Sequence, residues 1–136
     1  MTRPRAGVLS AAQQGLALRS KFPAARCKIT PGRLVWTGAV QPTPLSRTYT
    51  VRITYSTGGH PRVLVVRPTL DPRPGEPLPH VYREGSLCLY RDDEWQPNMF
   101  IADTILLWAC EWLAHYELWK ATGHWCGDRE LPAPAD

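Results

Sequence analysis

Three short runs rich in β-branched and aromatic residues fill positions 33–68 and constrain the fold more than any other feature. The runs read RLVWTGAV, RTYTVRITY and PRVLVVRP, a composition that favours strands. In the middle run Tyr49, Val51, Ile53 and Tyr55 alternate with polar residues, which indicates one buried face. The connecting segments QPTPLS and STGGHP are rich in turn residues and too short for a parallel crossover. An antiparallel meander is therefore predicted.

Helical patterns lie on both sides of these strands. Ser10 is a suitable N-cap for a short amphipathic helix that ends near Phe22. A longer helix is predicted from about Phe100 to Ala121, and Gly123 suits its C-terminal end. The apolar stripe of this helix, which we assign to packing against the sheet, consists of Ile101, Ile105, Trp108, Trp112, Tyr116 and Trp119.

The length of 136 residues and the hydrophobic content of 43% suit one compact domain, and the order of elements predicts the α+β class. We expect the domain to cover 1–136, with flexible ends at about 1–8 and 128–136. No apolar run is long enough for a membrane span, and the N-terminus lacks the continuous apolar stretch of a signal peptide. A cytoplasmic protein without membrane attachment is expected.

Charge and cysteine spacing argue against nucleic-acid and metal partners. The net charge of +4 comes with arginines spread from Arg3 to Arg129, while aromatic residues collect near the C-terminus among acidic ones. We interpret the basic charge as solvated surface and expect no nucleic-acid partner. The four cysteines include no CxxC pair, and His124 with Cys126 would supply only half of a metal site. No metal ion or other cofactor is expected, and Cys27 is placed in a linker before the first strand.

A proline-rich segment from Pro68 to Trp95 follows the strands and carries Cys88 within GSLCLYRDDEWQP. Its prolines prevent both a helix and a central strand, so a stiff ordered loop is expected to deliver the cysteine. Between Leu87 and Leu89, Cys88 is either a small core residue or a reactive thiolate. The neighbouring charges do not distinguish these two interpretations. The flanking arginines would lower the pKa of the Cys88 thiol, whereas the acidic run that follows would raise it.

The segment HVYREGSLCLYRDDEWQP resembles the active-site region of ubiquitin-conjugating enzymes. His80 matches the family histidine, Gly85–Leu89 matches the signature that contains the catalytic cysteine, here Cys88, and Trp95–Pro97 matches the WxP that follows it. The order of elements from Ser10 to Gly127 is similar to the ubiquitin-conjugating fold.

The C-terminal sequences ADTILLWACEWLAHYELW and TGHW are similar to bacterial relatives of these enzymes in anti-phage CBASS operons. The chain length matches the stand-alone conjugating protein of the short type II form. The resemblance implies a thioester between Cys88 and the C-terminus of a partner nucleotidyltransferase, a CD-NTase-like synthase. It also implies transfer of that C-terminus to an amine acceptor on a protein or small molecule, which would prime the synthase.

The sequence departs from the family pattern where Val81 and Tyr82 replace the proline and asparagine after the histidine. The spacing from histidine to cysteine is also shorter. Because that asparagine is associated with stabilising the oxyanion, backbone N–H groups or the side chains of His80 and Tyr82 are candidates for this role. Asp92 or Asp93 could take or orient the proton of the attacking amine. The other interpretation of the two aspartates is a solvated acidic loop.

Three other functions fit the same residues. The chain could be an inert binding module with a buried Cys88, or a cysteine hydrolase that uses Cys88, His80 and a carboxylate. A nucleic-acid-binding role is supported by charge alone. An exposed part of the tryptophan stripe would suit a homodimer or another partner. The transferase interpretation requires that the sulfur of Cys88 be open to solvent.

Overall fold

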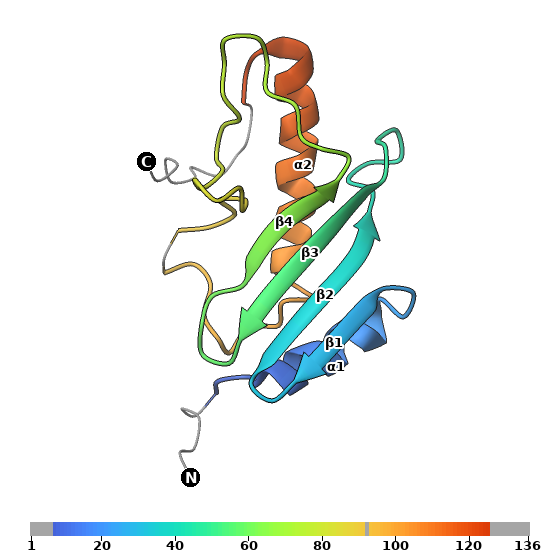
Figure 1. Cartoon of the computed structure of the whole chain (residues 1–136), viewed down its shortest axis with the longest axis vertical. Helices are drawn as coiled ribbons and strands as arrows, with labels where there is room; N and C mark the ends of the chain where they lie inside the picture. The colour runs from blue at the N-terminus through green and yellow to red at the C-terminus, as the bar shows by residue number, and fades with distance from the viewer. Residues whose placement is uncertain (1–6, 92, 126–136) are drawn as a thin grey trace.

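The computed structural model describes residues 7–91 and 93–125. In chain order its elements are α1 (Ala11–Lys21), β1 (Arg26–Thr30), β2 (Arg33–Val40), β3 (Tyr49–Ser56), β4 (Arg62–Arg67) and α2 (Ile105–Thr122). The strands form one antiparallel sheet in the order β1-β2-β3-β4, and both helices lie on the same side of it (Figure 1). The predicted α+β meander with a helix at each end is confirmed.

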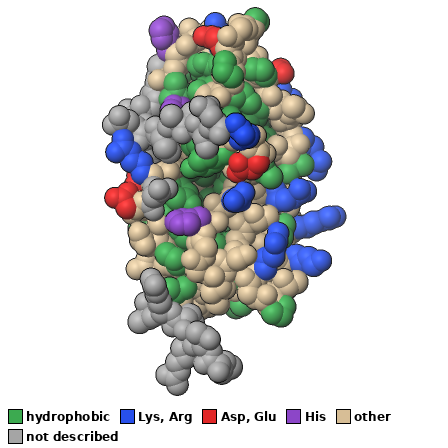
Figure 2. All heavy atoms as spheres, turned by 60° about the vertical axis from the view of Figure 1, so that its left-hand side comes forward, with side chains coloured by type: hydrophobic (Ala, Val, Ile, Leu, Met, Phe, Trp, Pro, Cys, Tyr) green, Lys and Arg blue, Asp and Glu red, His purple; other side chains and the backbone are tan. Residues whose placement is uncertain are grey.

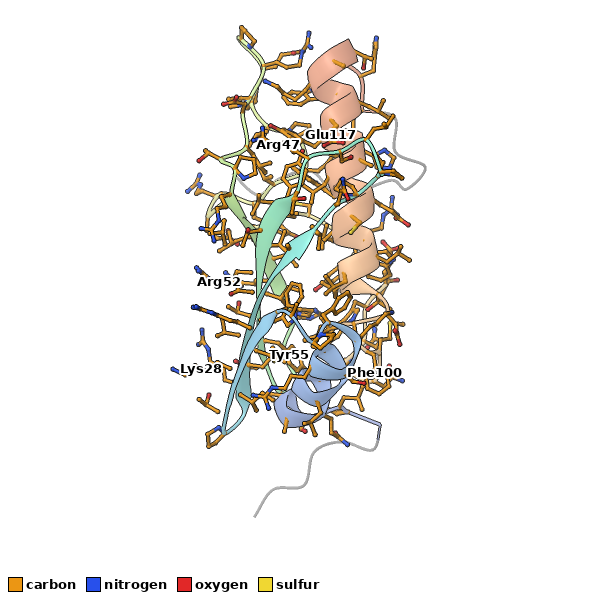
Figure 3. The ribbon with its side chains drawn as sticks, turned by 90° about the vertical axis from the view of Figure 1, so that its right-hand side faces the viewer. Lys28, Arg47, Arg52, Tyr55, Phe100 and Glu117 are labelled. Atoms are coloured by element: carbon orange, nitrogen blue, oxygen red, sulfur yellow. The ribbon has the colours of Figure 1, made fainter. Side chains whose placement is uncertain are left out.

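Strand alternation divides the sheet into a buried face and an open face. On the buried face Leu34 lies opposite Tyr55 and Trp36 lies opposite Ile53, and none of the four is more than 2% exposed. The side chains of α1 and α2 complete the core against this face. Lys28 and Arg52 project from the opposite face, away from both helices (Figure 3).

The N-terminus of α1 is capped as predicted. The hydroxyl of Ser10 accepts a hydrogen bond from the backbone N–H of Gln13 at 3.1 Å, and Oε1 of Gln13 accepts one from the N–H of Ser10 at 2.8 Å. The next residue, Gln14, is 0% exposed and reaches the segment that precedes α2. Its Nε2 donates to the carbonyl of Met99 at 2.8 Å, and its Oε1 accepts from the N–H of Ile101 at 2.9 Å.

Gln14→Ala is expected to lower the free energy of unfolding by about 2–4 kcal/mol, because it leaves a buried N–H and a buried carbonyl without their partner. Urea denaturation followed by tryptophan fluorescence measures this effect. Gln13→Ala is the matched control, since it removes one exposed capping contact and should cost about 1 kcal/mol or less. Equal losses in the two variants would contradict the role assigned to Gln14.

The structure corrects the start of the long helix. We predicted it from about Phe100, but α2 begins at Ile105 because residues 101–104 form turns. The N–H of Ile101 donates to the side chain of Gln14, and the N–H of Asp103 donates to the carbonyl of Phe100 at 3.1 Å. These two N–H groups therefore do not make the hydrogen bonds of an α-helix. The predicted C-terminal cap is confirmed, since Gly123 is left-handed and its N–H bonds the carbonyl of Trp119 at 2.8 Å. Neither helix in the described part of the chain combines the length and apolarity needed to cross a membrane.

The position of Cys27 is a second correction. It was placed in a linker, but it lies in β1, where it pairs with Trp36 of β2. β1 is an edge strand in which exposed Arg26, Lys28 and Thr30 alternate with half-buried residues. This largely polar sequence lacks the apolar alternation that identifies the other strands. Its strand conformation is stabilised by hydrogen bonding to β2 and not by its local sequence pattern.

Candidate active site

A short hairpin after β4 carries Cys88. Val81 and Leu87 form an antiparallel bridge, and the N–H of Tyr82 donates to the carbonyl of Ser86 at 2.8 Å. The turn between them uses Gly85 at a φ of 99°, a left-handed conformation that strongly favours glycine. The N–H of Leu87 bonds the carbonyl of Val63 at 2.9 Å, which fixes the hairpin to β4. The rigid sheet therefore determines where Cys88 lies.

His80 positions Cys88 through its backbone. Its carbonyl accepts hydrogen bonds from the N–H of Cys88 at 2.9 Å and from Nε1 of Trp112, on α2, at 3.0 Å. The φ of His80 is 54°, which is unusual for a residue with a side chain. Its ring contacts that of Trp125, with centroids 5.1 Å apart. The sequence-predicted His80 and Cys88 are thus brought together, and α2 helps to hold them.

The thiol of Cys88 is covered, contrary to the requirement that it be open to solvent. The residue is 0% exposed. Burial raises the pKa of Cys88 to about 11, a hydrogen bond with the Tyr82 side chain lowers it, and the negative charge of Glu84 raises it. In this conformation the sulfur is a protonated thiol at neutral pH. A side-chain contact with Cys88 places the predicted Tyr82 within the site.

A pocket of about 270 Å³ lies beside the covered cysteine. Its lining residues are His60, Pro61, Arg62, Tyr82, Glu84, Ser86, Leu87, Leu89 and Tyr90. Both neighbours of Cys88 therefore face the pocket, while Cys88 does not. The pocket therefore lies beside Cys88 without reaching its sulfur.

Asp93, one of the two acidic residues predicted to act beside the cysteine, is not brought to it. Asp93 is exposed, and its carbonyl accepts a hydrogen bond from Nε2 of Gln96 at 3.3 Å. Among the described residues, no hydrogen bond or ion pair joins the Asp93 side chain to Cys88. Asp92 lies outside the described residues, as does Cys126 of the half metal site. Trp95 is 0% exposed and donates to Thr104 at 3.1 Å, so it supports the region without lining the pocket.

Comparison with known families decides which protein class this site belongs to. The family model described as Type II CBASS E2 protein matches residues 14–132, which include the sheet, the Cys88 hairpin and α2. This chain belongs to the type II CBASS E2 family. The chain therefore has an E2-like role in CBASS, a form of antiviral defence. A search of curated proteins gave no match.

Two residues of this CBASS E2 protein contribute to the site but were not identified from sequence. Trp112 was assigned to core packing; it is buried, and its indole N–H also holds His80. Glu84 accepts a hydrogen bond from the buried hydroxyl of Ser86, which lowers the pKa of Glu84 and keeps a charge near Cys88. The position of Glu84 in the turn EGS, four residues before Cys88, could have identified it from the sequence. The contact of Trp112 with His80 depends on tertiary packing and has no local sequence signal.

Proposed function

We propose that this CBASS E2 protein is a transferase that carries the C-terminus of a partner protein as a thioester on Cys88. The partner is a CD-NTase-like nucleotidyltransferase, and the acceptor is an amine on a protein or small molecule. The position of Cys88 carries this proposal, because the hairpin fixed to β4 and α2 places it between two residues that line a pocket. Membership of the family supports the same conclusion.

The chemistry consists of two acyl transfers. Sulfur of Cys88 loses its proton and attacks the activated carbonyl of the partner's C-terminus, and a carbon–sulfur bond forms as the activating group leaves. The acceptor amine then attacks the thioester carbonyl, the carbon–sulfur bond breaks, and the attacking nitrogen gives up a proton. We assign the Tyr82 hydroxyl to the oxyanion, because Tyr82 already reaches the sulfur and replaces the family asparagine. Asp93 remains a candidate proton acceptor only if the loop moves.

The covered thiol gives this transferase a closed resting state. With a pKa of about 11, Cys88 cannot react at an appreciable rate until the hairpin opens and water or partner groups reach it. We propose that seating of the partner's C-terminus in the adjoining pocket opens the site. Reactivity would then depend on the correct partner.

A second candidate function is supported by the burial of Cys88. If the hairpin never opens, the protein is a binding module that recruits the synthase without chemistry. The substitution Cys88→Ala distinguishes the two functions. A binding module would keep its function, because Ala fills the small buried site, whereas the transferase would lose all activity.

The test is incubation with the neighbouring nucleotidyltransferase under conditions that activate its C-terminus, followed by electrophoresis with and without thiol reductant. We expect a covalent adduct that reductant removes, and its complete loss in Cys88→Ala. Cys110→Ala is the matched control, since Cys110 is a half-buried thiol on α2, and it should keep the adduct. An adduct of equal yield in Cys88→Ala would overturn the assignment.

A further inference from the structure

Charge is divided unevenly along the chain. All twelve acidic residues lie at or after Asp71, whereas most of the sixteen lysines and arginines precede it. The region 1–70 forms α1 and all four strands, so the sheet is built from a segment without a single carboxylate side chain. Such asymmetry is a reason to ask where the basic side chains lie.

The fold gathers five of these basic residues on the open face of the sheet. This basic face is formed by Arg26, Lys28, Arg33, Arg52 and Arg62, all of them exposed. Strand pairing explains the grouping: Thr37 lies opposite Arg26 on one side and Arg52 on the other. Lys28 and Arg52 point away from the helices (Figure 3), and basic side chains gather along one side of the molecule (Figure 2).

Most of this charge is not neutralised within the described part of the chain. The ion pairs there join Lys21 to Asp103, Arg62 to Glu84 and Arg73 to Glu76, so only Arg62 of the basic face has a carboxylate partner. That pair spans 3.4 Å between two exposed side chains, and such pairs contribute little. The basic face is therefore available to an external anion.

One corner of the basic face is shaped to receive a carboxylate. A second pocket of about 270 Å³ includes Arg33, Thr54, Ser56 and Arg62 in its lining. Ser56 pairs with Arg33 across β2 and β3, and Thr54 pairs with Arg62 across β3 and β4. Two guanidinium groups thus flank two hydroxyl-bearing residues. A guanidinium donates parallel hydrogen bonds to both oxygens of a carboxylate, and hydroxyls can supply further donors.

The side chains between the basic residues favour a protein partner over nucleic acid. Val35, Thr37 and Leu64 are half-buried on this face, and no aromatic side chain from the strands is available there to stack on bases. Arginine beside small apolar contacts is typical of protein interfaces.

We propose that the basic face is a docking surface for an acidic segment of a partner protein, with one carboxylate of that segment seated between Arg33 and Arg62. The face lies on the side of the sheet away from α2 (Figure 3). Its Arg62 corner adjoins the Cys88 hairpin, because Arg62 also lines the pocket beside Cys88 and pairs with Glu84. This second contact surface does not require that Cys88 react, and its failure would leave the thioester proposal standing.

The probe is a short fluorescein-labelled polyglutamate peptide, and binding is measured by fluorescence anisotropy at physiological salt. We expect the combined variant Lys28→Ser, Arg33→Ser, Arg52→Ser to bind about tenfold or more weakly than the parent chain. The matched control combines Arg47→Ser, Arg83→Ser and Lys120→Ser, which changes net charge equally outside the basic face and should alter affinity by about twofold or less. Arg33→Lys alone should weaken binding several-fold, because it keeps the charge but loses the paired donors.

Three outcomes would overturn the proposal. Equal weakening in the two triple variants would show that net charge alone attracts the peptide. Tighter binding of a single-stranded DNA of matched charge, lost in the same variant, would make nucleic acid the occupant. Self-association in sedimentation that disappears in the Lys28, Arg33, Arg52 variant would make the occupant a second copy of this chain.

Discussion

The rate at which iodoacetamide alkylates Cys88 will rise about tenfold for each pH unit above pH 7 and will level off only near pH 11. The cause is burial, which raises the pKa of Cys88 to about 11 from an ordinary value of 9.0. Only roughly one thiol in ten thousand is ionised at pH 7, and the thiolate is the reacting species. Mass spectrometry of proteolytic peptides at timed intervals measures the rate at Cys88 separately from the rates at the other cysteines.

Two substitutions shift this pH profile in opposite directions. Tyr82→Phe removes the hydrogen bond that lowers the pKa of Cys88, so the plateau moves to higher pH. Glu84→Gln removes the negative charge that raises it, so the plateau moves to lower pH. A plateau between pH 7 and 8 in the parent chain, or shifts of the same sign in both variants, would contradict the environment described for Cys88.

Trp112→Ala is expected to lower the free energy of unfolding by about 3–5 kcal/mol, the largest stability effect that a single substitution in α2 should give. Trp112 is 1% exposed and stacks on Tyr116, with centroids 5.8 Å apart and planes 9° apart. It also contacts Trp125 at 5.3 Å and donates to His80. Its removal leaves a cavity between α2 and the Cys88 hairpin. Urea denaturation followed by circular dichroism gives the measurement.

Trp112→Phe separates packing from hydrogen bonding. The phenyl ring keeps most of the buried contact, but the carbonyl of His80 loses one of its two donors, at a cost of about 1–2 kcal/mol. Because His80 then holds Cys88 less firmly, alkylation of Cys88 should become several-fold faster in this variant. Leu107→Ala is the control, since Leu107 is 55% exposed on the same helix and should change stability by about 0.5 kcal/mol or less. Similar losses for Trp112→Ala and Leu107→Ala would contradict the packing described.

The main elements of the fold were predictable because their signals are local. Alternation at Tyr49, Val51 and Ile53 identified β3, the Ser10 cap identified α1, and Gly123 identified the end of α2. β1 was missed because its exposed residues are basic or polar, and its strand conformation comes from pairing with β2. The start of α2 was misplaced because Gln14, distant in sequence, bonds the backbone at Ile101.

The residues around Cys88 could be singled out from the sequence more readily than the burial of its thiol. The signature singled out the segment that carries Cys88, but as an ordered loop and not as a hairpin, and the backbone of His80 bonds that of Cys88. The burial of Cys88 and the positive φ of His80 depend on packing against α2, which no local pattern encodes. The basic face was likewise invisible, because arginines that are dispersed in sequence become neighbours only through strand register.

A closed resting site is compatible with an E2-like role, because acyl transfer requires an exposed thiol only when the correct partner is bound. In the proposed function, the pocket lined by Leu87 and Leu89 would receive the partner's C-terminus before the sulfur is uncovered. Binding energy from the pocket, and from any contact on the basic face, would then be used to open the hairpin.

The most direct test is to map where the acyl group sits in the purified adduct. After proteolysis at mildly acidic pH, which preserves thioesters, we expect the peptide containing Cys88 to carry the C-terminal residues of the nucleotidyltransferase. Treatment with hydroxylamine should return that peptide to its unmodified mass. The same mass increase on a peptide that contains any other cysteine, with Cys88 unmodified, would show that Cys88 does not carry the acyl group.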